Sequence, residues 1–321
     1  MDLLEHVPAT LDPTDRSAVP DEVVGRSRVW HILAHDPMFW VGATIVTLVV
    51  LGALLAPFIA PHDPLEQFRD AINAKGDPTG PSAEFPLGVD MVGRDYLSRL
   101  LWGARTSLLI GIGANVIATA LGLLVGSIAA LARSPRLPLP GRRSVGIPVE
   151  SLLMRATDLW LAFPVLLLTI AVAAVVGPSV ELVIVIIATT LWTATARIVY
   201  MRMVILRGSA FVEASRALGG SGPHIFWRHH LPNVSPLLVV YASLGIAATI
   251  LFEATLSYLG VGVPPPTPTW GTMLADHIGR FVTDPRLVML PGFAITITVL
   301  AFNLLGDSLR DAMDPRSWGA R

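Results

Sequence analysis

Three features of this 321-residue chain have residue types suited to chemistry: one lysine, a glycine–serine string and three clustered histidines. A phosphate loop that hydrolyses nucleotides needs a lysine after a glycine-rich turn, because that lysine reaches the terminal phosphates. The chain's one lysine, Lys75, follows Asn73 and Ala74 and lies in no such loop. With no cysteine, the chain also lacks disulfides, thiolate nucleophiles and zinc–sulfur sites. We therefore expect no phosphate-loop ATPase activity in this chain.

The string at 219–222 matches the Gly-x-Ser-Gly pattern of intramembrane serine proteases, and His229 and Asn233 follow it. Such a protease needs its serine at membrane depth with a base in reach. Ser221 instead lies in a polar segment, and its continuation through 223–230 cannot span a membrane. The sequence therefore disfavours a protease.

The histidines at 224, 229 and 230 do not share one helical face, and no carboxylate lies between them. A His-Glu-x-x-His zinc motif is also missing from the sequence. We therefore predict neither a metal site nor a catalytic residue.

The composition is that of an integral membrane protein. Apolar residues make up 53% of the chain, charged residues only 15%, and the mean hydropathy is +0.62. The net charge of −1 gives no reason to expect nucleic acid as a partner.

Six long apolar segments are each able to cross about 30 Å of hydrocarbon as a helix. The shortest has only 15 uncharged residues between Glu181 and Arg197, and it reaches full length if Arg197 extends its charge towards the membrane surface. The predicted spans are 38–60, 106–132, 159–180, 182–200, 234–256 and 287–306.

Basic residues indicate how these spans are oriented. If both termini are cytoplasmic, 16 of the 23 basic residues lie on the inside, as the positive-inside rule favours. The domains are then a cytoplasmic tail over 1–37, an extracytoplasmic loop over 61–105, a helical core over 106–316 and a cytoplasmic tail over 307–321. Residues 26–37 form either a short interfacial helix or a solvated linker.

The charges Asp158, Glu181, Glu253 and Asp307 all fall at span ends. Carriers driven by ion gradients usually place ionisable groups in mid-span, so this pattern weakens the interpretation of the chain as such a carrier. The carrier interpretation stays open, because polar residues and a helix broken at Pro164 can line a path.

The polar segment over 208–233 predicts a helical hairpin between the fourth and fifth spans. Ser209 is placed to cap a first helix, Gly219 to end it, Ser221 to cap a second, and Pro232 to end that one. The simpler alternative is that this hairpin only connects the two spans. A DNA-binding role is implausible for a membrane-tethered hairpin with two basic residues.

Within this hairpin, Glu213-Ala214-Ser215, then Gly219, then Leu231-Pro232 resembles the coupling-loop signature of permeases of ATP-binding-cassette importers. Ser215 stands where that family usually has a second alanine. The resemblance implies that the hairpin fits a groove on a separate ATPase subunit. The residues that it places at this contact are Phe211, Glu213, Ala214, Ser215, Ala217, Leu218, Gly219, Leu231 and Pro232.

Three further stretches, 86–108, 257–271 and 300–316, resemble the peptide/nickel group of these permeases, in particular the C-type subunit of dipeptide and oligopeptide permeases. Val89 departs from the more usual threonine. The resemblance covers residues ~38–316 and implies an all-α integral membrane protein of the bacterial inner membrane. Its fold would be the type I importer (MetI-like) permease fold, with six transmembrane helices and both termini cytoplasmic.

The implied function is import of short peptides by alternating access. The implied partners are a second homologous permease subunit in a heterodimer, two cytoplasmic ATPase domains that bind ATP and Mg, and an extracytoplasmic peptide-binding protein. This chain itself would bind no cofactor. Three alternatives stay open: nickel chelates or haem-like cargo, an ATPase-independent secondary carrier, and a membrane scaffold without transport.

A peptide's backbone polarity must be met inside the path, so polar residues within the spans are candidates to line it. They are Asn115, Thr119, Thr189, Thr190, Trp192 and Thr195.

Overall fold

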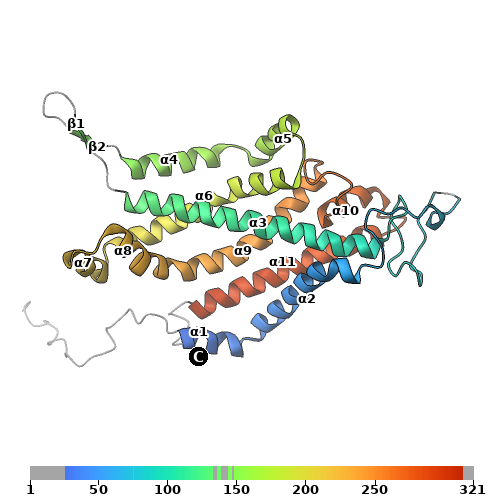
Figure 1. Cartoon of the computed structure of the whole chain (residues 1–321), viewed down its shortest axis with the longest axis horizontal. Helices are drawn as coiled ribbons and strands as arrows, with labels where there is room; N and C mark the ends of the chain where they lie inside the picture. The colour runs from blue at the N-terminus through green and yellow to red at the C-terminus, as the bar shows by residue number, and fades with distance from the viewer. Residues whose placement is uncertain (1–25, 75, 133–135, 139–143, 147, 314–321) are drawn as a thin grey trace, which may run out of the picture.

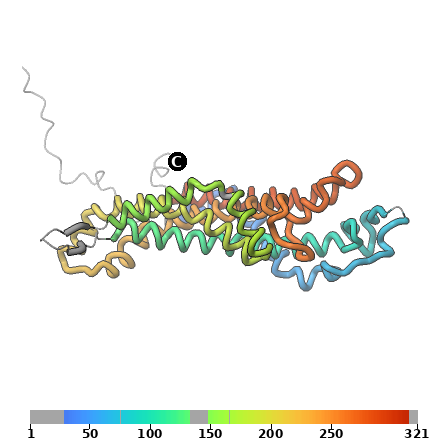
Figure 2. Tube along the Cα trace, turned by 90° about the horizontal axis from the view of Figure 1, so that it is seen from above, coloured from blue at the N-terminus to red at the C-terminus, as the bar shows by residue number. Residues whose placement is uncertain are grey.

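The computed structural model describes residues 26–74, 76–132, 136–138, 144–146 and 148–313. Most of the tail predicted over 1–37 and the end of the tail predicted over 307–321 lie outside these residues. Figure 1 shows long helices running side by side along one axis, and Figure 2 shows that the bundle is thin when it is seen from above.

Eleven helices are assigned in the described residues: α1 (Arg26–His35), α2 (Pro37–Ile59), α3 (Tyr96–Leu131), α4 (Val149–Ala162), α5 (Val165–Val176), α6 (Val180–Arg207), α7 (Ala210–Ala217), α8 (Gly222–Ile225), α9 (Leu231–Tyr258), α10 (Trp270–His277) and α11 (Arg286–Met313). Short 3-10 turns, η2 (Arg69–Ala71) and η4 (Ile278–Arg280), and a π-turn, η3 (Phe226–His230), join them. Strands β1 (Arg136–Pro138) and β2 (Ser144–Gly146) pair antiparallel.

Five of the described helices are long and apolar enough to cross a membrane, and a sixth span results if α4 and α5 count as one. These two are bent by 83° relative to each other. The break falls at Phe163–Pro164, where proline lacks an N–H and disfavours helix in the residue before it. The chain is therefore an all-helical membrane protein with five to six candidate spans.

Several helices extend beyond the spans predicted from sequence. The spans 182–200, 234–256 and 287–306 lie inside α6, α9 and α11, each of which continues past them at both ends. Helix α3 begins ten residues before the predicted 106, because Asp95 caps it by accepting a hydrogen bond from Ser98 N at 3.0 Å.

The most extensive helix contact joins α3 to α6. Two glycines of α3, Gly122 and Gly126, lie directly against the α6 backbone. A Cβ on Gly122 would stand 2.8 Å from Trp192 O, and a Cβ on Gly126 would stand 2.5 Å from Ala196 O. Small residues permit such close approach in membranes, where packing rather than water exclusion holds helices together.

A buried carboxylate ties three helices together at the α10 end. Glu253 on α9 accepts hydrogen bonds from Ser257 Oγ at 2.8 Å, Thr269 Oγ1 at 2.9 Å and Ser107 Oγ at 3.3 Å. Ser107 belongs to α3, and Thr269 caps α10. Since a buried charge or acid is costly unless it is hydrogen-bonded, this network fixes α10 against α3 and α9.

Replacing Gly126 with alanine should destabilise the chain by about 1–3 kcal/mol, the usual cost of overpacking, because its methyl group would press on Ala196 O. The matched control is Gly113→Ala on the same helix, where the nearest atom, Ile184 Cδ1, is 3.9 Å from the added Cβ. Thermal melting in detergent should show a lower Tm for G126A only. An equal Tm for the two variants would contradict the close contact.

Candidate coupling hairpin

The predicted hairpin over 208–233 is a helical turn that joins α6 to α9. It contains α7, α8 and the π-turn η3. Figure 1 places it at one end of the bundle and α10 at the other, and Figure 2 agrees. Any force applied to the hairpin therefore enters at the ends of two long helices.

The turn after α7 is built as the sequence predicts. Gly219 has a φ of +83°, the left-handed conformation that glycine adopts without steric cost. Gly220 N donates to Ser215 O at 2.9 Å and Gly219 N donates to Arg216 O at 3.0 Å. This pair of hydrogen bonds is a Schellman motif, which satisfies the last carbonyls of α7 and reverses the chain.

Ser209 occupies the N-cap position of α7 but does not act as predicted. In the described structure its side chain accepts no capping bond, and its hydroxyl donates to Leu206 O at 2.6 Å instead. Ser221 does cap α8, accepting from His224 N at 3.4 Å, with a proline in the first turn.

The prediction that Pro232 ends the second arm is wrong. The helical chain runs from α8 through η3 into α9, and residues 222–258 count together as one candidate span. A π-turn makes this possible: Leu231 N bonds to Phe226 O, five residues back, just before the proline that has no N–H to donate. The second arm of the hairpin is therefore the start of α9.

Most residues predicted at the ATPase contact lie on the first arm. Phe211, Glu213, Ala214, Ala217, Leu218 and Gly219 are exposed, and Ser215 is half-buried. Leu218 is 90% exposed. Leu231 and Pro232 lie on the second arm, at the start of α9.

Contacts between the two arms hold the hairpin in shape. The rings of Phe211 and His229 are 5.8 Å apart, and Val212 and Ile225 are buried beneath the turn. The exposed surface of the hairpin is therefore presented by a folded unit.

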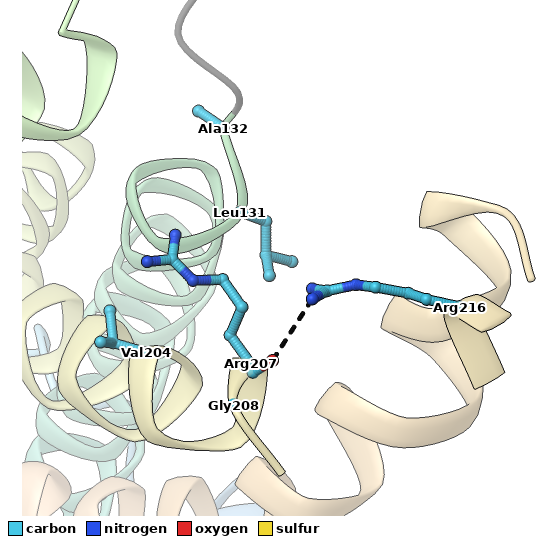
Figure 3. Close-up of a pocket in the computed structure, with 6 residues that line it drawn as sticks. All are labelled: Leu131, Ala132, Val204, Arg207, Gly208 and Arg216. Atoms are coloured by element: carbon cyan, nitrogen blue, oxygen red, sulfur yellow. Dashed lines mark hydrogen bonds between the residues drawn. The ribbon is translucent and has the colours of Figure 1, made fainter. Parts of the chain in front are cut away.

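A cavity of about 540 Å³ separates α7 from the ends of α3 and α6 (Figure 3). Arg216 Nη1 on α7 donates to Arg207 O at 3.4 Å, and Arg207 Nη1 donates to Ala130 O at 3.0 Å. The first bond connects α7 to α6, and the second connects α6 to α3. The residues that line the cavity are Leu131, Ala132, Val204, Arg207, Gly208 and Arg216.

The polar residues predicted to line a path are distributed over two helices. Asn115 is buried and donates to Ala242 O at 2.8 Å, so it joins α3 to α9. Thr195 packs against Gly122 at the α3–α6 contact.

Thr189 and Thr190 donate to backbone carbonyls of α6. Thr119 and Trp192 are half-buried. Among the described residues, no group of three or more His, Asp or Glu side chains is arranged to hold a metal ion.

Sequence reasoning missed one pair of charges. Asp158 was treated as the end of a span, and Arg197 was expected to extend its charge towards the membrane surface. The two lie inside α4 and α6 and form an ion pair with each other. They are 39 residues apart, so no local pattern links them.

Comparison with known proteins places these features in a family. Residues 122–319 match the binding-protein-dependent transport system inner membrane component family, and residues 26–75 match the N-terminal TM domain of oligopeptide transport permease C. The di/tripeptide transport system permease protein DppC of Pseudomonas aeruginosa is 40% identical over 89% of this chain and 91% of its own. The glutathione transport system permease protein GsiD of Escherichia coli is 38% identical over 90% of each chain.

One solved structure, an inward-facing conformation of the MetNI methionine ABC transporter, has a similar fold. Its matching chain has a TM-score of 0.53 and 19% identity, over 67% of this chain and 96% of that one. The family pattern covers most of the chain, and the curated relatives match nearly all of it. The chain therefore belongs to the inner membrane components of binding-protein-dependent transport systems, as a multi-pass permease rather than the ATPase.

Proposed function

We propose that this chain is a gate subunit of an ATP-driven importer of short peptides. The observation that carries the proposal is the hairpin: a folded, exposed turn whose second arm is the first part of a membrane-length helix. A partner that moves this turn also moves α9. The 28 residues of α9 extend over about 42 Å at the usual helical rise.

The proposed substrate class rests on the relatives. DppC, several permeases described as peptide permeases, and the glutathione permease GsiD all match this chain over at least 86% of its length. Di- and tripeptides, and glutathione as a modified tripeptide, share a peptide backbone with charged ends. Short peptides are therefore the class that we assign.

In the proposed assembly, the hairpin and both chain termini are cytoplasmic, and the chain crosses the membrane six times, with α4 and α5 forming the third span. This orientation is supported by the basic residues outside the spans: with Arg197 of the fourth span left out, it places 15 inside and 7 outside. A second homologous permease would complete the path, and an extracytoplasmic binding protein would deliver the peptide. Two ATPase domains would hold the ATP and Mg.

The proposed mechanism is alternating access. ATP binding closes the ATPase domains against the hairpin, and α9 carries the displacement towards the Glu253 network and α10 at the opposite end. The helices have two packed arrangements, and nucleotide binding on the partners biases which one is populated.

Reversing the charge at the hairpin should separate this chain from its ATPase. Glu213→Lys places a cation where the partner surface accommodates a carboxylate, so co-purified ATPase should fall at least ~10-fold, a loss of ~1.4 kcal/mol in binding. The matched control is Glu66→Lys, an exposed glutamate of the extracytoplasmic loop. It should leave ATPase recovery unchanged.

The same purified complex also tests whether transport is driven by ATP. Wild-type proteoliposomes supplied with binding protein should accumulate tritiated dialanine or trialanine only with ATP. Uptake that persists without ATPase and collapses with the proton gradient would contradict the proposal. Normal ATPase recovery with Glu213→Lys would contradict the assigned contact.

Replacing Gly219 with alanine should destabilise the hairpin and leave the membrane-spanning helices unchanged. An alanine held at a φ of +83° costs about 1–2 kcal/mol, so faster hydrogen exchange is expected over residues 210–220. Gly222→Ala is the control, because no atom lies within 4 Å of its added Cβ and its φ is not positive. Equal exchange in both variants would refute the Schellman turn as the hairpin's support.

A further inference from the structure

An ion pair joins two helices of the membrane-spanning bundle. Arg197 lies in α6, within the predicted fourth span 182–200 and three residues from its end. Its partner, Asp158, is on α4. The aspartate side chain is 58% exposed and the arginine side chain is 46% exposed.

A charged side chain within a span seldom faces lipid tails, because hydrocarbon cannot solvate it. It faces a water-filled cavity or another protein surface. The exposed side of the α4–α6 pair is therefore an inner surface of the assembled transporter. Thr190 lies seven residues before Arg197 and so shares its helix face.

The break between α4 and α5 gives the same result independently. Phe163, at the break, is 54% exposed, and Leu167, just beyond it, is 65% exposed. A broken helix at membrane depth frees backbone carbonyls, and such backbone is tolerated only where it is buried in protein or lines a cavity. In transporters, broken helices form substrate sites.

The ion pair is not the sole link between α4 and α6 in the described structure, because other contacts join them on both sides of it. Tyr200 Oη donates to Glu150 Oε1 at 2.5 Å, and Trp160 Nε1 donates to Thr189 O at 2.6 Å. Two charges placed between these contacts are therefore available for another purpose.

We propose that Asp158 and Arg197, beside the break at Phe163–Pro164, form a transit site for the charged ends of a peptide. This inference rests on the proposed function. The peptide ammonium would pair with Asp158, and the peptide carboxylate would pair with the planar fork of Arg197. When the path is empty, the two side chains neutralise each other, so no unpaired charge is left in the membrane.

Because the ion pair is half-exposed, it suits brief binding of a passing peptide rather than long retention of that peptide. Conduction through a membrane path requires binding that is favourable enough for entry and weak enough for release. The empty site has one ion pair and the loaded site has two, so no charge is left unpaired in either state. The peptide can therefore pass without being trapped.

The test uses the complete transporter, captured from native membranes through a tag on this chain and reconstituted with its binding protein and ATP. The key variant is the neutral double variant Asp158→Asn/Arg197→Gln, which leaves no lone charge. We expect the tritiated dialanine or trialanine imported per ATP hydrolysed to fall at least tenfold. ATPase activity stimulated by the loaded binding protein should stay within twofold of wild type.

Two further variants separate charge recognition from helix attachment. Tyr200→Phe removes a neighbouring α4–α6 contact and should keep the wild-type peptide-to-ATP ratio. Asp158→Glu/Arg197→Lys keeps both charges and should retain at least half of that ratio.

Three results would overturn the transit site. These are an unchanged ratio in the neutral double variant, an equal loss in Tyr200→Phe, or loss of the second permease from the purified double variant, which would place the charges at a subunit interface. A wild-type transporter that imports neither peptide with ATP would overturn the proposed function, and the transit site with it.

Discussion

The close contact between α3 and α6 is the constraint on which the rest of the structure depends. In a membrane, two helices gain nothing by excluding water from each other, so they are held by how closely their backbones approach. Gly122 and Gly126 allow α3 to lie against the carbonyls of Trp192 and Ala196. This contact fixes α6, and α6 ends where the hairpin begins.

The bundle divides into a closely packed part and a loosely attached part. Helices α2, α3, α6, α9 and α11 pack on one another extensively, whereas α4 and α5 make few contacts with them (Figure 1). The closely packed helices carry the hairpin at one end and the Glu253 network at the other. Such a division suits a gate, because rigid helices transmit a displacement and loosely held ones respond to it.

Parts of the local backbone conformation were predictable from the sequence, whereas contacts between distant residues were not. The turn at Gly219 depends on one residue's backbone freedom, so the sequence sufficed to place it. Pro232 was misjudged because a proline normally stops a helix, and only the π-turn before it relieves the missing donor. The hydroxyl of Ser209 donates to Leu206 O instead of capping α7, and residue type alone does not choose between these two roles.

Asp158 and Glu253 illustrate why charges at the ends of hydropathy windows are ambiguous. A span defined as a charge-free run ends at the first charged residue, even when the helix continues through that residue. Glu253 lies five residues before the end of α9 and is buried among three hydroxyls that come from segments on both sides of it in the sequence. Asp158 lies within α4 and meets an arginine from α6. A membrane charge is therefore best interpreted by its partner: Glu253 is satisfied within the chain, whereas the exposed Asp158–Arg197 pair marks a surface that this chain alone leaves uncovered.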